Sequence, residues 1–136
     1  MSDDSDHEEA YLLVKDASTF AFASDDMLRA ISKLMVRQSV QDGHVFVREG
    51  DIQENWFILD KGVVTRYKLG DKKHHHKDPH PDFEHHTVLD HLEGKGRVTA
   101  LFHSLNENHR SYSTLVASGP VQLWSVNAME YRKLLQ

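Results

Sequence analysis

The sequence predicts a mainly β fold with flanking α-helices, in the form of a small antiparallel barrel or roll. Short apolar runs of strand length recur between residues 41 and 126, with turn signals about every 8–12 residues. Helical periodicity is confined to the two ends of the chain. Because the helices do not alternate with the strands, the pattern argues against a parallel α/β sheet.

The first strong helical pattern covers residues 24–36. Its apolar residues recur at helical spacing and predict one buried stripe: Met27, Leu28, Ile31, Leu34 and Met35. Ser24 is a suitable N-cap, and the helix dipole favours the two acids that follow it. Upstream, residues 11–14 and 20–22 predict shorter helical pieces that pack nearby.

Strand patterns follow this helix. A turn at 41–43 precedes the alternating run 44–48, and a turn at 50–51 precedes the apolar strand 56–59. A third turn at 60–62 leads into residues 63–69. There the side chains alternate as in a half-buried antiparallel strand, with Val63, Thr65, Tyr67 and Leu69 on one face and Arg66 and Lys68 on the other.

The second half of the chain opens with residues 70–86, which contain two prolines and no apolar period and are expected to form a long exposed loop. Strand signals resume at 87–89, and a glycine turn at 94–96 leads to a small helix expected over 99–105. Two strands are expected at 113–117 and 121–126. A capping box of Asn127 and Glu130 begins the final helix, whose apolar stripe is Tyr131, Leu134 and Leu135.

Composition limits the function classes. A chain of 136 residues is about one domain long. The absence of cysteine excludes a disulfide framework and a thiolate metal site. No apolar run approaches the ~20 residues of a membrane-spanning helix, and the first residues have no signal-peptide pattern. A cytoplasmic location is therefore expected.

Charge divides the chain into two parts. Residues 1–9 hold five acids and no Lys or Arg, whereas the rest of the chain balances 16 acids with 16 bases. Residues 1–17 are therefore expected to be an acidic, partly disordered segment before a domain at 18–136. Because the body is not basic, no nucleic-acid partner is expected.

A run of matching residues then points to a known family: Phe46, Gly50, Asp51, Trp56, Phe57, Ile58, Gly62 and Val64. In their order they resemble the Phe-x-x-Gly-Asp turn, aromatic strand and Gly-x-Val of the cyclic-nucleotide-binding domain. Residues 113–135 resemble the last strands and following helix of its cAMP- and cGMP-dependent kinase regulators. The resemblance covers residues 18–136 and implies an eight-stranded antiparallel β-roll, a double-stranded β-helix of jelly-roll type.

The resemblance also implies a ligand site. Family members hold the cyclic phosphate with backbone N–H groups at a helix N-terminus and one arginine, and the ribose with a glutamate. Here Ala100 and Leu101 match the family's Ala-Leu, but no acid occupies the glutamate position. Aligning Thr114 with the family's threonine puts Ser111 in the arginine position, beside Arg110. The expected phosphate-binding residues are Arg97, Thr99, Ala100, Leu101, Arg110 and Ser111.

Loss of the glutamate removes a charge-assisted hydrogen bond worth about 1.5–3 kcal/mol, roughly a ten- to hundredfold change in affinity. The sequence therefore predicts a non-catalytic regulatory or sensor module whose cAMP or cGMP binding is weak or lost, serving signalling or protein interaction. The alternative is a working cAMP or cGMP sensor that regulates a protein kinase or channel. Either function implies an effector, a kinase catalytic subunit or a longer parent chain, and no cofactor.

Histidines raise a second alternative, a metal-binding protein. Seven of the 11 histidines lie within residues 74–91, and the weak candidate ligands are His74, His76, His80 and His85. Because the segment has no strand period, it does not predict a preorganised ligand set, and no metal site is assigned. No Gly-x-Ser-x-Gly elbow surrounds the serines near His103 and His109, so no enzyme activity is expected.

Overall fold

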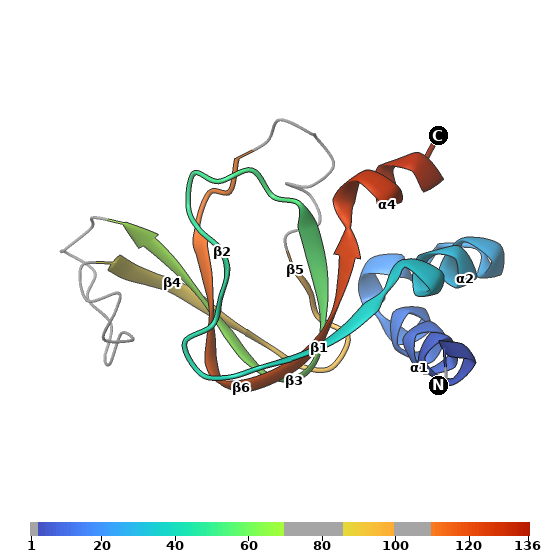
Figure 1. Cartoon of the computed structure of the whole chain (residues 1–136), viewed down its shortest axis with the longest axis horizontal. Helices are drawn as coiled ribbons and strands as arrows, with labels where there is room; N and C mark the ends of the chain where they lie inside the picture. Colours follow the sequence, from blue (N-terminus) through green and yellow to red (C-terminus); the bar gives the residue numbers. More distant parts are fainter. Residues whose placement is uncertain (1–2, 70–85, 100–109) are drawn as a thin grey trace.

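The computed structural model describes residues 3–69, 86–99 and 110–136, and Figure 1 shows its two parts. The α-helices gather at one end, beside both chain termini, and an antiparallel sheet curls into a roll beside them. The paired strands β3 (Asn55–Leu69) and β4 (His86–Glu93) extend to the end opposite the helices. The mainly β fold with flanking helices that the sequence predicts is confirmed.

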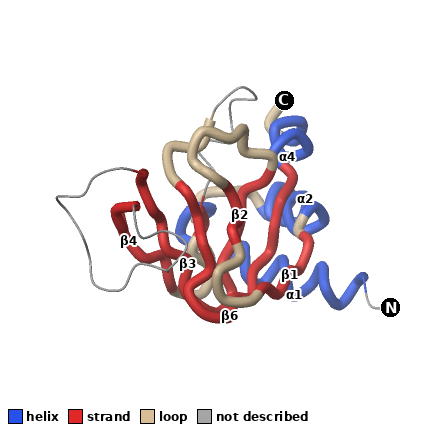
Figure 2. Tube along the Cα trace, turned by 60° about the vertical axis from the view of Figure 1, so that its left-hand side comes forward, coloured by secondary structure: helices blue, strands red, loops and turns tan. Residues whose placement is uncertain are grey.

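The sheet is antiparallel throughout its pairings. β1 (Val36–Val40) and β2 (Val45–Val47) both pair with β6 (Thr114–Asn127), which pairs in turn with β3. On its other side β3 pairs with β4 and with the short β5 (Val98–Thr99). Thus β3 and β6 form the centre of the roll and hold the other strands around it (Figure 2).

Both central strands bend within their length. The pairing of β3 with β6 shifts register between Leu59 and Val63, around the turn expected at 60–62. Gly62 has φ +104° there, and Gly119 on β6 has φ +88°. When the halves of β3 and β6 on either side of these bends are counted separately, the described strands match the eight expected.

Strand β1 was not predicted from sequence. Its residues, VRQSV, are exposed apart from half-buried Val40, so they show no buried alternation. The strand forms because its backbone pairs with β6, from Val36 opposite Ser125 to Val40 opposite Val121. The strand therefore forms because of its tertiary pairing with β6, although its own amino-acid composition does not predict a strand.

Two helices begin as predicted. The Ser24 hydroxyl accepts a hydrogen bond from the Met27 N–H at 3.1 Å, and α2 spans Asp25–Leu34. The Asn127 side chain accepts from the Glu130 N–H at 2.9 Å, and α4 spans Ala128–Leu134. A short 3₁₀ helix, η1 (Ser18–Phe20), buries Phe20. Both predicted N-caps are confirmed, because each side-chain oxygen satisfies an otherwise unpaired helix N–H.

The N-terminal segment, expected to be partly disordered, is helical in the structure, and the helical piece expected at residues 11–14 lies within this helix. Residues Asp3–Asp16 form helix α1, which lies beside α2 in Figure 1. The helix buries one stripe of residues: Ala10, Tyr11, Leu13 and Val14. The Tyr11 hydroxyl also donates to the Asp25 carboxylate on α2. Disorder was expected because the first nine residues hold five acids. The apolar stripe that begins at Ala10 nevertheless packs the helix against the domain.

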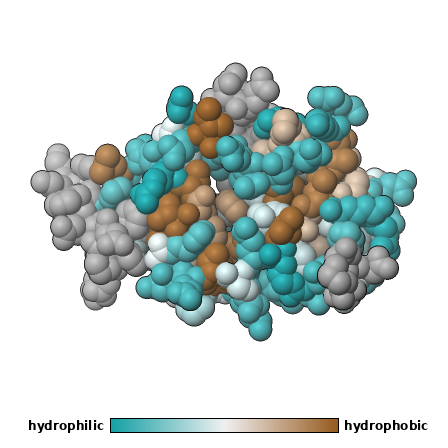
Figure 3. Space-filling model, viewed as in Figure 1, coloured by the Kyte–Doolittle hydropathy of each residue, from teal (hydrophilic) through white to brown (hydrophobic). Residues whose placement is uncertain are grey.

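Two apolar cores follow from this arrangement. The first lies between the helices and the sheet, where fully buried Trp56 meets Phe20 and Tyr131 at ring-centroid distances of 5.6 and 5.0 Å. The second lies inside the roll and includes Phe57, Leu59, Val64, Leu115 and Leu123. In the space-filling view apolar residues surround a hollow in the middle of the roll (Figure 3).

Among the described residues, no helix is both long enough and apolar enough to span a membrane.

Candidate functional site

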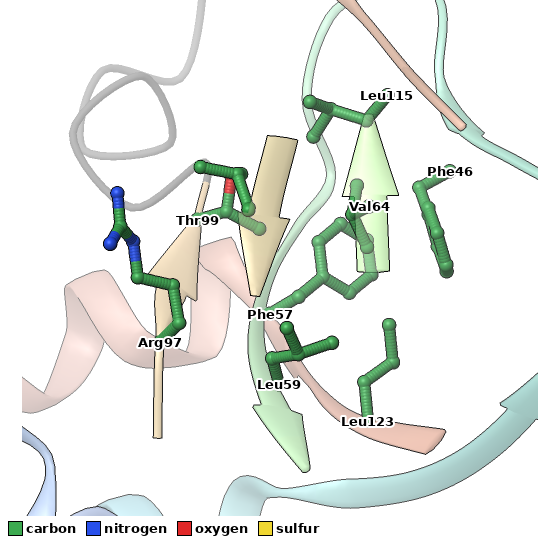
Figure 4. A pocket seen from close by; sticks show the side chains of 9 residues that line it. Phe46, Phe57, Leu59, Val64, Arg97, Thr99, Leu115 and Leu123 are labelled. Carbon is green, nitrogen blue, oxygen red and sulfur yellow. The ribbon is translucent and has the colours of Figure 1, made fainter. Parts of the chain in front are cut away.

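The inside of the roll contains a small, mostly apolar cavity, which we call the inner cavity (Figure 4). Its volume is about 280 Å³ even when the part open to solvent is included. Ligand pockets commonly have volumes of about 300–1,000 Å³. The lining residues are Phe46, Phe57, Leu59, Val64, Leu92, Arg97, Thr99, Leu115 and Leu123.

Arg97 and Thr99 are the polar residues of the inner cavity. The Leu59 N–H donates to the Arg97 carbonyl at 2.8 Å, and the Gly96 N–H donates to the Leu59 carbonyl at 2.8 Å. Thr99 is paired with Phe57 of β3. Figure 4 shows the Arg97 guanidinium extending away from the apolar side chains. The cavity therefore presents mainly hydrocarbon surface, with one hydroxyl and the stem of one arginine.

Arg110 lies in a different place from Arg97. Its guanidinium donates to the Gly50 carbonyl at 2.9 Å, and its backbone forms an isolated bridge with Ile52. It lines a second depression, which we call the outer hollow, of about 880 Å³ including open space. The outer hollow is lined by Phe46, Val47, Asp51, Ile52, Gln53, Glu54, Asn55, Phe57 and Arg110.

Ser111 is buried, and its side chain and backbone are hydrogen-bonded within the protein. It is 6% exposed, and its hydroxyl donates to the Ser113 carbonyl at 2.6 Å. Its N–H donates to the Asp51 carbonyl at 2.8 Å, and its carbonyl accepts from the Gly50 N–H at 2.9 Å. The Gly-Asp turn is thereby tied to residues 110–111 far along the chain.

The predicted site residues thus fall into three groups. Arg97 and Thr99 share the inner cavity, and Arg110 lies in the outer hollow with Ser111 next to it in the chain. The two depressions share the aromatic side chains of Phe46 and Phe57, whose ring centroids are 5.3 Å apart. Ala100 and Leu101 lie outside the described residues, as does the helix expected over 99–105 except Thr99, which belongs to β5.

The histidine candidates cannot be located in the structure. His74, His76, His80 and His85 all lie outside the described residues, as does most of the loop expected at 70–86. In the described ranges, no group of three or more His, Asp or Glu side chains is placed to hold a metal ion.

Two ion pairs on β3 were not predicted. Arg66 donates to both carboxylate oxygens of Asp90 on β4, each at 2.6 Å. These bonds lower the pKa of Asp90 below its ordinary value, although partial burial opposes the shift. The positive residues of β3 were identified from sequence, but their partner depends on the β3–β4 register, which sequence patterns do not specify.

The second ion pair joins Lys68 to Glu49, with Nζ 3.0 Å from the carboxylate. Lys68 also donates to the Tyr112 carbonyl at 3.0 Å and lies 3.9 Å from the centroid of the Tyr112 ring. Burial raises the pKa of Glu49, but hydrogen bonds from the Leu69 N–H and from Lys68 lower it overall. Glu49 therefore stays ionised and fixes the far end of β3.

Known proteins match this chain in fold and not in sequence. No family model matches the chain, and no curated protein matches it in sequence. The regulatory domain of Toxoplasma gondii PKA with cAMP is similar with a TM-score of 0.79 and 12% identity, covering 97% of this chain and 46% of that one. A cyclic nucleotide-binding-like protein from Brucella abortus has a TM-score of 0.70 and 16% identity, covering 93% of this chain and 97% of that one.

A third similar structure is the regulatory subunit of a cAMP-independent protein kinase A from Trypanosoma cruzi, bound to guanosine. Its TM-score is 0.79 at 15% identity, covering 98% of this chain and 43% of that one. The chain thus spans less than half the length of the two kinase regulatory structures. These similarities show that the chain has the cyclic-nucleotide-binding fold, as residues 45–68 predicted.

Proposed function

We propose that this chain is a non-catalytic regulatory module of cytoplasmic signalling, and that it binds cAMP and cGMP weakly or not at all. Its role is to contact an effector protein, such as a kinase catalytic subunit or another part of a longer parent chain. The cyclic-nucleotide-binding fold supports a regulatory role, because the similar structures are described as regulatory domains and subunits.

The small apolar inner cavity is the observation that carries this proposal. A cyclic nucleotide brings a charged phosphate and ribose hydroxyls, which need hydrogen-bond partners when they leave water. The described lining provides hydrocarbon from seven residues and polar groups only from Arg97 and Thr99. No carboxylate lines the cavity within the described residues, which agrees with the missing glutamate in the sequence.

The positions of the arginines support the same conclusion. A phosphate is held well when a guanidinium and backbone N–H groups converge on it. Arg97 extends away from the apolar lining, and Arg110 donates to the Gly50 carbonyl in the outer hollow. If Arg110 were to hold a phosphate in the inner cavity, it would first have to break this bond, which costs part of the affinity gained.

A working cyclic-nucleotide sensor is the second candidate function. Arg97 and Thr99 on the cavity wall favour it, since together they offer one charged donor and one hydroxyl. The Toxoplasma gondii regulatory domain with this fold is described with cAMP, whereas the Trypanosoma cruzi subunit is described as cAMP-independent. The fold therefore occurs in a protein that binds cAMP and in one described as cAMP-independent. The affinity of this chain for cAMP and cGMP decides between the two candidate functions.

Isothermal titration calorimetry of the chelator-treated chain tests the proposal. The protein is titrated with cAMP and then with cGMP, each up to millimolar concentration. We expect no saturable binding below the high-micromolar range. Sub-micromolar binding of either nucleotide would contradict the proposal and establish the sensor.

If binding heat is observed, two variants show which arginine holds the phosphate. Arg110→Ala abolishes binding if Arg110 moves to hold the phosphate, whereas Arg97→Ala abolishes it if the guanidinium on the cavity wall does so. Arg48→Ala, which removes an exposed arginine outside both depressions, is the matched control and leaves the titration unchanged.

A further inference from the structure

The side chain of Gln53 is buried without hydrogen bonds. The residue is 5% exposed, and within the described part of the chain neither its amide oxygen nor its amide nitrogen has a hydrogen-bond partner. Buried polar groups are nearly always paired, because leaving them unpaired forfeits their bonds to water. An amide with both ends unpaired therefore needs an explanation outside the packing of the fold.

The backbone around Gln53 is by contrast firmly connected. The Asp51 carbonyl accepts from the Ser111 N–H at 2.8 Å, and the Glu54 carbonyl accepts from the Ala128 N–H at 2.8 Å. Ile52 is bridged to Arg110. These contacts hold the segment in place on both sides, so the position of Gln53 is well defined while its amide remains unused.

Gln53 lies on the wall of the outer hollow, among groups that suit an uncharged polar ligand. Phe46 is partly exposed and lines the hollow, and its ring also contacts the rings of His44 and Phe57. Asp51 and Glu54 line the same space and can accept hydrogen bonds from hydroxyl groups. The Arg110 guanidinium already donates to a carbonyl, and two acids outnumber it. An anionic ligand is therefore disfavoured.

We propose that the outer hollow binds adenosine or a similar uncharged adenine nucleoside, with the base recognised by Gln53. A glutamine amide matches adenine in two hydrogen bonds, accepting from the N6 amino group and donating to N7. The purine ring stacks on Phe46, and the ribose hydroxyls donate to Asp51 and Glu54. The hollow opens to solvent and has a volume of about 880 Å³ with that open space included, so the nucleoside would lie in it only partly enclosed.

Binding also requires a small movement. Both polar atoms of Gln53 are shielded from solvent, so its side chain must turn toward the hollow before it can pair with the base. This movement exchanges two unpaired buried groups for two hydrogen bonds. The proposal does not depend on the inner cavity, and it stands whether or not that cavity takes a cyclic nucleotide.

Nuclear magnetic resonance of the full chain tests the proposal directly. The side-chain NH₂ signals of Gln53 are identified by their loss in the Gln53→Met variant. We expect them to shift saturably when adenosine is added up to millimolar concentration. Purine riboside, which lacks the N6 amino group, should bind about tenfold more weakly or worse.

Three outcomes overturn the proposal. The first is an absence of any shift of the Gln53 signals with adenosine, and the second is equal binding of adenosine and purine riboside. The third is unchanged adenosine affinity in Gln53→Met, where a loss of about tenfold or more is expected. The matched control is Gln122→Met, which removes an exposed glutamine on β6 and leaves adenosine binding intact.

The calorimetric test with cAMP and cGMP remains separate. A cyclic nucleotide that binds in the inner cavity through Arg97 contradicts the proposed function, and its affinity should not change in the Gln53→Met variant, because Gln53 does not line that cavity. Conversely, a failure of adenosine to bind leaves the cyclic-nucleotide result as it stands.

Discussion

A Cβ atom placed on Gly62 would lie 2.5 Å from the carbonyl oxygen of Pro120. The bend of β3 therefore passes against the backbone of β6 so closely that no side chain fits between them. Gly62 also has φ +104°, a conformation that other residues rarely adopt. Both facts explain physically why a glycine occupies this position in the Gly-x-Val pattern.

The first prediction concerns this contact. The Gly62→Ala substitution introduces both a steric overlap with Pro120 and backbone strain. We therefore expect it to lower the free energy of unfolding by more than about 2 kcal/mol. Gly94→Ala is the control, because Gly94 has φ +107° but no atom within 4 Å of the added methyl group. It should cost about 1–2 kcal/mol. Urea unfolding of both variants measures the difference, and equal losses would disprove a role for the close approach.

The second prediction tests whether helix α1 is part of the packed domain. Val14 is fully buried, whereas Leu12 on the same helix is 53% exposed. Val14→Ala should reduce the free energy of unfolding by about 1–3 kcal/mol, because it removes buried hydrocarbon. Leu12→Ala should change it by less than about 0.5 kcal/mol. If both substitutions were neutral, the helix would contribute nothing to stability in solution.

The third prediction is a pH dependence. Because Arg66 lowers the pKa of Asp90, the ion pair contributes stability above the ordinary carboxyl pKa of about 3.9. That contribution disappears as the pH falls further, through the lowered pKa of the folded state. Asp90→Asn should therefore lose less stability than the wild type between about pH 5 and pH 3.

This effect should be modest. The side chains of Arg66 and Asp90 are 34% and 40% exposed, so solvent screens the pair, and about 1 kcal/mol or less is expected at neutral pH. Thermal unfolding at a series of pH values compares the two proteins. Parallel acid profiles would show that Asp90 titrates normally in the folded state.

The fourth prediction concerns the cap of α4. Asn127→Ala removes the acceptor for the Glu130 N–H and should cost about 1 kcal/mol. Asn127→Gly should cost only a few tenths of a kcal/mol, because glycine is tolerated at this position. Chemical denaturation measures both. A larger loss for glycine than for alanine would indicate that Asn127 acts through its place at the end of β6 instead.

Local patterns predicted much of the fold. The stripe of α2, the caps at Ser24 and Asn127, and the strand at residues 56–59 could be identified because each depends on neighbours close in sequence. The ordered Gly-Asp and Gly-x-Val turns indicated the roll through their resemblance to the cyclic-nucleotide-binding domain.

Other elements needed long-range contacts. The exposed strand β1 forms only because β6 lies beside it, and helix α1 packs because Tyr11 and its neighbours meet α2. The partnership of Arg66 with Asp90 depends on the register of β3 and β4. The exposed strand and the ion pair have no signal within their own segments, and for α1 only the helical piece at residues 11–14 was predicted.

The sequence by itself determined the fold class of this protein and the positions of its helix caps and turns. Only the tertiary structure decided that Arg97 and Arg110 occupy different depressions and that Ser111 is tied to the Gly-Asp turn. It alone revealed the unpaired amide of Gln53. The physical reason is that caps, turns and apolar periodicity act over a few residues. A binding site, in contrast, depends on which side chains of distant segments converge and which already have partners.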